Sequence, residues 1–224
     1  MEVNSIGINK GFALQRISQE IKTPLKNFAA IGDSNNDLPA LKKVSLPIAV
    51  KTHSKELIAA SRYYLPYKKN VVSDAINKYI LNDEVDKIKL VVSDLDGTLL
   101  RNGSKTIAPH TIKSIVDMVD HHGVNFAIAS GRNIDDALLV LKDLKVKHKE
   151  RLFIISANGT VIYDVYKKKA IFQQTMEPQI AKSIYDTYKL IYNNKSHNGD
   201  IAVQVYLPND IKNITKPQNY YVLN

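Results

Sequence analysis

IKLVVSDLDGT, residues 88–98, is an apolar run that ends in two aspartates and a glycine. The run at 88–93 predicts a strand that is buried in a parallel sheet. Side chains two residues apart on extended backbone point the same way, so Asp94 and Asp96 can converge on one ligand. Open parallel sheets bind ligands beyond the carboxyl ends of their strands, where Gly97 also permits a tight turn. The alternatives are turn aspartates without function and a calcium loop, but a calcium loop requires further acidic residues that this sequence lacks.

Apolar runs with strand and helix periodicity alternate on both sides of this stretch. Short apolar runs predict strands at 28–31, 46–50, 124–129 and 152–155. Amphipathic spacing predicts helices at 10–21, 38–43, from about 54, and at 71–80, 111–122 and 134–144. Strands that alternate with helices predict an α/β fold, a doubly wound parallel sheet that is covered on both faces.

The pattern of residues changes after Gly159, where the sequence becomes richer in tyrosine and less uniformly apolar. Residues 160–166 and 170–175 predict a hairpin around a lysine run, followed by a helix at 178–192 and a strand at 201–207. We therefore expect three parts: residues 1–82 and 83–163 as the two halves of the core, and residues 164–224 as a partial α+β cap domain. A short polar segment, 81–87, links the two halves.

Composition narrows the possible partners of this 224-residue chain. The net charge of +9 comes from scattered lysines without interleaved aromatic residues, so nucleic acid is not favoured and a small phosphorylated molecule explains the charge at least as well. No apolar run approaches the roughly 20 residues that span a bilayer, and no signal peptide is apparent, so we expect a cytoplasmic protein without a membrane partner. The absence of cysteine excludes disulfides and thiolate metal sites. Nothing in the sequence indicates the oligomeric state.

A second acidic cluster, GDSNNDLPAL at 32–41, follows another short apolar run. Its first and last acids, Asp33 and Asp37, are suited to hard oxygen coordination of Mg²⁺. Asp37 could equally cap the helix that begins at Leu38, whereas Asp33 has no such local role.

Two further positions could bind phosphate. The strand at 124–129 ends in Ser130, Gly131 and Arg132, where a hydroxyl and exposed amides could hold phosphate oxygens, although Ser130 could instead be a helix N-cap. Lys10 opens the first helix, where the helix dipole disfavours a cation, so a functional lysine is plausible beside the commoner surface lysine.

Together these motifs resemble the four motifs of the haloacid dehalogenase superfamily. The residues within these motifs, with Asn158 and Gly159 before a second domain, are similar to those of the Cof-type sugar-phosphate phosphatases. The resemblance implies a magnesium-dependent phosphatase that hydrolyses a small phosphorylated metabolite, such as a sugar phosphate, through an aspartyl-phosphate. In that chemistry Asp94 would be the nucleophile, and Asp96 would protonate the leaving alcohol and then activate water.

The same resemblance implies a binding role for each remaining motif residue. The phosphate-binding residues would be Ser130, Gly131, Lys10 and Asn36. The Mg²⁺ ligands would be Asp33, Asp94 and Asp96, the last through its backbone carbonyl. Asp37 would support this set of residues. Two alternatives stay open, namely a phosphomutase of the same superfamily and a non-catalytic fragment or regulatory module that keeps the fold.

The order of the motifs differs from that of the superfamily. Residues 1–82 resemble the family's C-terminal part, and residues 88–224 resemble its N-terminal part. The chain could be a circular permutant or a piece of a tandem protein, and in either case the cap would be incomplete. We expect both parts to pack into one sheet, which would put the carboxylates of Asp33 and Asp94 roughly 3–5 Å apart around one ion. Lys10 would then lie beside Asp94 and lower the pKa of its carboxylate.

Overall fold

The computed structural model describes residues 7–66, 69–82, 84, 86–101, 103–175, 177, 179–180, 182–184 and 186–187. Contacts divide the chain into two units, one formed by Ile6–Gln173 and the other by Met1–Ser5 with Gln174–Asn224. The sheet and the helices around it belong to the first unit. Most of the helix expected at 178–192, and all of the strand expected at 201–207, lie outside the described residues, so the partial cap stays a prediction.

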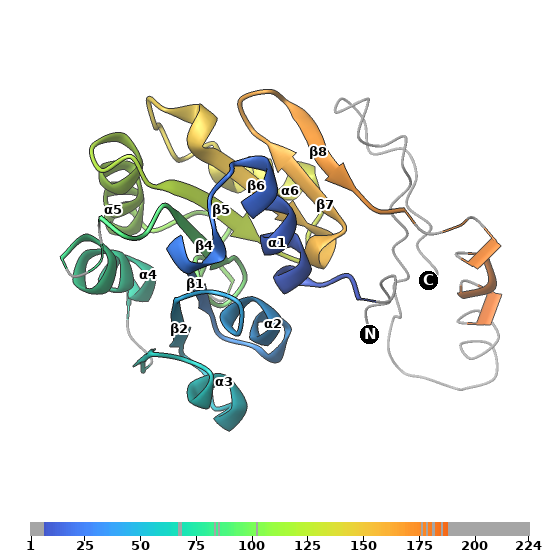
Figure 1. The fold of residues 1–224 in the computed structure, drawn as a ribbon, viewed down its shortest axis with the longest axis horizontal. Helices are drawn as coiled ribbons and strands as arrows, with labels where there is room; N and C mark the ends of the chain where they lie inside the picture. The colour runs from blue at the N-terminus through green and yellow to red at the C-terminus, as the bar shows by residue number, and fades with distance from the viewer. Residues whose placement is uncertain are drawn as a thin grey trace. The chain divides into compact units, whose positions relative to one another are not determined.

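An eight-stranded sheet forms the centre of the first unit, with the strand order β3-β2-β1-β4-β5-β6-β7-β8 (Figure 1). Neighbouring strands from β3 to β6 pair in parallel, whereas β7 and β8 are antiparallel. The bounds are β1 Phe28–Gly32, β2 Leu46–Val50, β3 Tyr63–Leu65, β4 Leu90–Asp94, β5 Asn125–Ala129, β6 Leu152–Ser156, β7 Val161–Asp164 and β8 Lys169–Gln173.

Helices cover both faces of the sheet, as the alternating pattern predicted. Their bounds are α1 Lys10–Glu20, α2 Leu38–Leu41, α3 Lys55–Ala59, α4 Val71–Ala75, α5 Pro109–Asp120 and α6 Ile134–Leu141, and a π-helical turn, Ile76–Leu81, continues α4. One buried apolar cluster joins the sheet to α4, α5 and α6, and a second joins it to α1, α2 and α3. Among the described residues, no helix is both long and apolar enough to cross a membrane.

The two parts of the chain meet at the middle of the sheet. Strand β1 of the first part pairs with β4 of the second, in a register that sets Ala29 opposite Val91 and Ile31 opposite Ser93. Successive residues of β1 alternate between the two clusters, so both faces of this seam are packed. The prediction of a single sheet is therefore confirmed.

Two strands differ from the sequence prediction. The expected hairpin is present as β7 and β8, but β7 pairs with β6, so β8 is the edge strand of the main sheet and not the beginning of a cap. The chain reverses direction after β6, so β7 returns antiparallel to β6 and the hairpin extends the same sheet. Strand β3 was not resolved from its surroundings in the sequence, because three residues are too few to show a period.

Helix α1 packs closely on α2, and Gly11 makes this contact possible. A Cβ atom at position 11 would lie 2.3 Å from the carbonyl oxygen of Pro39. Alanine is ordinarily the better helix former, but here its methyl group would force α1 away from α2. We therefore expect Gly11→Ala to lower the free energy of unfolding by about 1–3 kcal/mol, the usual cost of overpacking. Chemical denaturation measures this.

Gln15→Ala is the matched control for Gly11→Ala, because Gln15 is exposed on the same helix. Its free energy of unfolding should stay within about 0.5 kcal/mol of the wild type. A Gly11→Ala protein as stable as the wild type would contradict the close packing of the two helices.

Candidate active site

Acidic side chains from both parts of the chain gather where β1 and β4 end. Asp33 directly follows β1, Asp37 lies in the next turn, and Asp94 is the last residue of β4. One carboxylate oxygen from each of the three lies within 4.8 Å of the others. The predicted proximity of Asp33 and Asp94 is therefore confirmed, although the roles assigned to them stay predictions.

The buried ammonium of Lys10 binds two of these carboxylates. Its Nζ lies 2.6 Å from Oδ1 of Asp37 and 2.5 Å from Oδ1 of Asp94, which is 84 residues away in the sequence. The side chain of Asn9 caps α1 by accepting from the amide of Phe12, which fixes the turn that carries Lys10. Burial lowers the pKa of Lys10, but the two carboxylates outweigh it, so the pKa is raised overall.

Both oxygens of Asp37 are engaged within the protein. Oδ1 binds Lys10, while Oδ2 accepts hydrogen bonds at 3.0 Å from the amides of Asp33 and Ser34. The bond from the Ser34 amide belongs to a capping box over the turn Asn35–Asp37, in which Ser34 is the N-cap. Asp37 occupies the N-cap position of α2, but its side chain makes no capping hydrogen bond to that helix, so the expected cap at Leu38 is absent. Asp37 thus orients its neighbours and is poorly placed to be an ion ligand itself.

Asp33 is held against the turn that follows β4. Its Oδ1 accepts a 2.8 Å hydrogen bond from the hydroxyl of Thr98, and its Oδ2 faces the α-carbon of Gly97. A Cβ at position 97 would lie 2.5 Å from that oxygen, and the φ of +83° there also favours glycine. Asp33 and Asp94 thus offer a set of hard oxygen donors, which is the kind that Mg²⁺ prefers.

The pKa of Asp94 differs from the expectation. Burial is the largest influence and raises it from 3.8 to about 7, even though the charge of Lys10 lowers it. The nearby carboxylates of Asp37 and Asp33 raise it further, and burial also raises the pKa of Asp33. The prediction of a lowered pKa was wrong because it counted the adjacent cation and neither the desolvation nor the like charges.

Arg132 binds Asp96 with a two-pronged ion pair, a contact that the sequence motif did not reveal. Its Nε lies 2.9 Å from Oδ2 of Asp96, and one terminal nitrogen lies 2.5 Å from Oδ1. Both oxygens of Asp96 accept hydrogen bonds in this arrangement, so proton donation to a substrate requires Arg132 to release one of them. An arginine directly after Ser130 and Gly131 is the only trace of this pairing in the sequence.

The other predicted phosphate-binding residues lie at different depths. Ser130 is buried and directly follows β5, whose last residue, Ala129, pairs with Asp94. The hydroxyl of Ser130 accepts a hydrogen bond from the amide of Arg132. The N-cap of α6 is Asn133, not Ser130. Gly131 is half-buried beside it, whereas Asn36 is exposed. Among the described residues, no hydrogen bond joins the side chain of Asn36 to the acidic cluster.

Lys51 also belongs to this region, although no sequence motif includes it. It directly follows β2, and its Nζ donates a 3.0 Å hydrogen bond to the carbonyl of Gly97. Its backbone φ is +51°, in the left-handed region. A lone lysine after an apolar run carries no sequence signal for such a contact.

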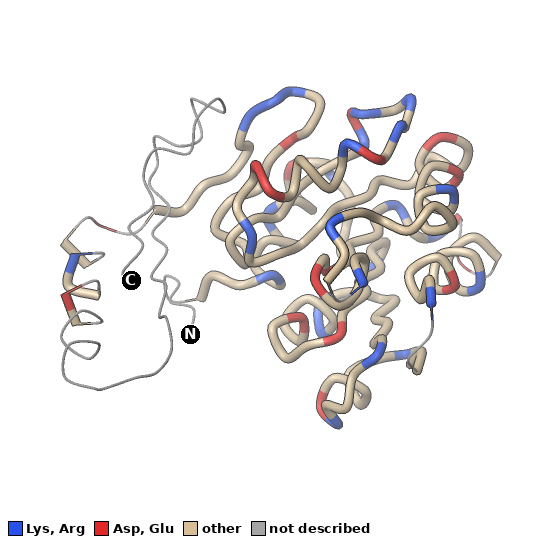
Figure 2. The backbone as a smooth tube through the Cα atoms, turned by 180° about the vertical axis from the view of Figure 1, so that it is seen from behind, with Lys and Arg blue, Asp and Glu red and all other residues tan. Residues whose placement is uncertain are grey.

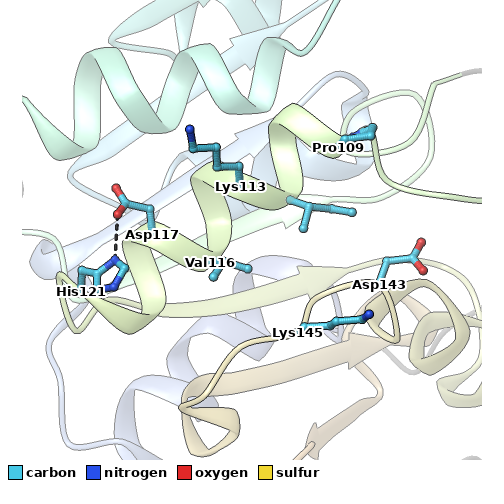
Figure 3. A pocket seen from close by; sticks show the side chains of 8 residues that line it. Pro109, Lys113, Val116, Asp117, His121, Asp143 and Lys145 are labelled. Atoms are coloured by element: carbon cyan, nitrogen blue, oxygen red, sulfur yellow. Dashed lines mark hydrogen bonds and ion pairs between the residues drawn. The ribbon is translucent and has the colours of Figure 1, made fainter.

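Other charges are dispersed over the first unit. Figure 2 shows lysine and arginine positions on many elements with acidic positions between them, in keeping with the scattered pattern in the sequence. An apolar groove beside α5, whose lining includes Ile112 and Val116, is shown in Figure 3. Its rim pairs Asp117 with His121 at 2.9 Å, and none of the predicted site residues line it.

Comparison with known proteins places this geometry in context. The family model of the haloacid dehalogenase-like hydrolases matches residues 1–80 and 91–222. A presumed phosphatase of Buchnera aphidicola subsp. Baizongia pistaciae is 33% identical over 135 residues, which are 60% of this chain and 42% of that protein. The phosphoglycolate phosphatase of Methanothrix thermoacetophila is 38% identical over 63 residues, 28% of each chain.

Another relative is the 5-amino-6-(5-phospho-D-ribitylamino)uracil phosphatase of Bacillus subtilis, which is 38% identical over 50 residues, 22% of this chain and 20% of that one. A solved haloacid dehalogenase-like hydrolase from Bacteroides thetaiotaomicron is 26% identical with a TM-score of 0.41, over 46% of this chain and 38% of that chain. The chain spans less than half the length of each of these proteins.

The raised pKa of Asp94 predicts how stability depends on pH without metal. A carboxyl group whose pKa is higher in the folded state binds more protons when folded, so stability falls as pH rises from about 4 to about 7. Asp94→Asn removes this titration, and the variant should be more stable than the wild type at pH 7.5 but not at pH 4. Denaturation in excess chelator at both pH values measures the difference, at most a few kcal/mol at roughly 1.4 kcal/mol per pKa unit.

The exposed Asp86 gives a control, since Asp86→Asn should follow the wild type at both pH values. Equal pH dependence in Asp94→Asn and the wild type would show that Asp94 is not buried as a destabilising charge.

Proposed function

Because this chain belongs to the haloacid dehalogenase-like hydrolases, we propose that it hydrolyses phosphate monoesters of small metabolites, with Asp94 as the nucleophile. The observation that carries the proposal is the contact of Lys10 with both Asp94 and Asp37, beside Asp33, at the carboxyl edge of one sheet. These groups come from two parts of the chain that are far apart in sequence. A cation among buried carboxylates is suited to binding and attacking a phosphoryl group.

In the first step a carboxylate oxygen of Asp94 attacks phosphorus, and the bond from phosphorus to the ester oxygen breaks. Lys10 holds Asp94 and offsets the charge that collects on the phosphoryl oxygens. A bound Mg²⁺, held by Asp33, Asp94 and the backbone carbonyl of Asp96, would supply further positive charge to these oxygens. The product of this step is an aspartyl-phosphate on Asp94.

Asp96 moves the protons in both steps. It first gives a proton to the departing alkoxide. For this step Arg132 must release one of the two carboxylate oxygens of Asp96. Asp96 then takes a proton from the water that attacks the phosphorus of the aspartyl-phosphate. This second attack releases inorganic phosphate and regenerates the carboxylate of Asp94. The release of inorganic phosphate is what separates a phosphatase from a phosphomutase.

The remaining roles follow the same logic. Ser130, Gly131 and Asn36 contact the phosphoryl oxygens, and Asp37 orients Lys10 and the amides around Asp33, a role that its four contacts support. The names of two relatives each contain a small phosphorylated metabolite, which supports this substrate class, and sugar phosphates are the subclass we propose within it. Of residues 164–224, the part that follows β8 would contribute part of a cap that selects among them.

The two aspartates should fail in different ways. Asp94→Asn should lower turnover to below roughly a thousandth of the wild-type rate, because a neutral amide is a poor nucleophile. Asp96→Asn should let the phosphoenzyme accumulate, because no group then activates water. Phosphate release from an aryl phosphate and a panel of sugar phosphates, together with mass spectrometry of the intact chain, measures both effects.

Asp86→Asn, the exposed variant used above, should retain wild-type turnover. The nucleophile assignment fails if Asp94→Asn keeps more than about a thousandth of the activity. Transfer of the phosphoryl group back to the sugar without release of phosphate would instead identify a phosphomutase.

Activity should depend on the divalent ion that is supplied. Excess chelator should abolish phosphate release, and Mg²⁺ should restore it better than Ca²⁺, because Ca²⁺ prefers more ligands at longer distances. Asp33→Asn should lower the affinity for Mg²⁺ and leave the fold intact. Measuring the rate of phosphate release at increasing Mg²⁺ concentration, in the wild type and in Asp33→Asn, tests the metal assignment. Full activity in excess chelator would contradict it.

A further inference from the structure

Three segments meet around Gly97, and each comes from the carboxyl end of a different parallel strand. The turn after β4 carries Gly97 itself, Asp33 follows β1, and Lys51 follows β2. Lys51 donates to the carbonyl of Gly97, and a Cβ atom on Gly97 would lie 2.5 Å from Oδ2 of Asp33. Lys51 is therefore linked to a carboxylate that is proposed to bind metal, through one intervening residue.

We propose that Lys51 is a positioning residue for Asp33, which fixes the turn at Gly97 and thereby the carboxylate that holds Mg²⁺. This inference rests on the proposed function, because it assigns a role within the same site. Groups that orient metal ligands from behind typically change metal affinity by about 10- to 100-fold when they are removed.

The contacts of Asp33 explain how the position of Gly97 is transmitted. The carboxylate lies between the hydroxyl of Thr98, at 2.8 Å, and the α-carbon of Gly97, which leaves no room for a methyl group. A shift of the turn would therefore move or rotate Asp33. Lys51 opposes such a shift, because a charged donor makes a stronger hydrogen bond to a carbonyl than a neutral one does.

Lys51 itself is well anchored at its backbone. Its amide donates to the carbonyl of Leu65 at 3.0 Å, which continues the pairing of β2 with β3. The next residue, Thr52, accepts a 2.9 Å hydrogen bond from the hydroxyl of Tyr64 through its carbonyl. The side chain of Ser54 then reaches Asn35, in the turn that follows Asp33, at 2.7 Å. The loop after β2 thus contacts both the turn at Gly97 and the turn that follows Asp33.

The backbone of Lys51 adds a second observation. A φ of +51° is unfavourable for a residue with a Cβ, and glycine would adopt it without cost. Lys22 has the same φ, but it is exposed just after α1, where helices commonly end in this conformation. At Lys51 the ammonium contact offers a reason to keep a side chain where glycine would be easier.

The charge of Lys51 has two opposing effects on a bound cation. It repels the ion directly, but it also favours the ionised form of Asp33, whose pKa burial raises. Burial lowers the pKa of Lys51, and the charge of Asp33 opposes this only in part. The hydrogen bond to Gly97 holds the ammonium against the turn, so we expect orientation of the ligand to outweigh repulsion of the ion.

Calorimetric titration of the full chain with Mg²⁺ tests the inference without relying on activity. Lys51→Met keeps the Cβ and an unbranched side chain one atom shorter but loses the ammonium, and it should bind Mg²⁺ about tenfold more weakly. Lys51→Arg keeps a charged donor and should recover affinity at least in part. Lys22→Met, at the same φ on the exposed surface, should bind Mg²⁺ as the wild type does.

Lys51→Gly separates the effect of the ammonium contact from that of the left-handed backbone at position 51. It also replaces Lys51→Met as the test variant if that protein folds poorly. Glycine relieves the left-handed backbone, so thermal stability should equal or exceed that of the wild type while Mg²⁺ affinity falls. Unchanged or tighter Mg²⁺ binding in both variants would overturn the role of Lys51 and leave the proposed function standing. A wild-type chain that binds no Mg²⁺ would overturn the metal assignment itself, and this inference with it.

Discussion

The buried ammonium of Lys10 is the interaction on which the candidate site depends. It binds Asp94 and Asp37, while Asp33 lies close to both. Three carboxylates in so small a volume repel one another, and one cation does not neutralise them. The repulsion among the carboxylates therefore costs free energy, and a bound divalent ion would offset that cost. Such sites commonly reduce stability in exchange for reactivity.

The site exists because two distant parts of the chain share one sheet. The first part provides Lys10, Asp33 and Asp37, and the second provides Asp94 with the turn that follows it. Parallel pairing of β1 with β4 brings the ends of both strands to the same edge, as open α/β sheets do generally. The reversed order of the motifs is compatible with this geometry, and both a permutant and a tandem piece stay hypotheses for its origin.

Much of this arrangement could be read from the sequence, because strongly periodic runs and strand-ending acids are local signals. The strand at 46–50 and the proximity of Asp33 to Asp94 are examples that the structure confirms. Contacts of single side chains across the fold have no local signal, which is why the pairing of Arg132 with Asp96 and that of Lys51 with Gly97 were missed. The direction of the Asp94 pKa shift failed for a related reason, since burial is a property of the assembled core.

The central position of the β1–β4 seam also affects how the chain is made. Within this chain a ribosome delivers β1, β2 and β3 before β4, so β4 cannot cover its flank of β1 until all three have been made. An open flank exposes unpaired backbone groups to other nascent chains, and contacts as distant as Lys10 to Asp94 form late. Yield from cells should therefore be sensitive to translation speed and to chaperone supply, even for variants whose final stability is unchanged.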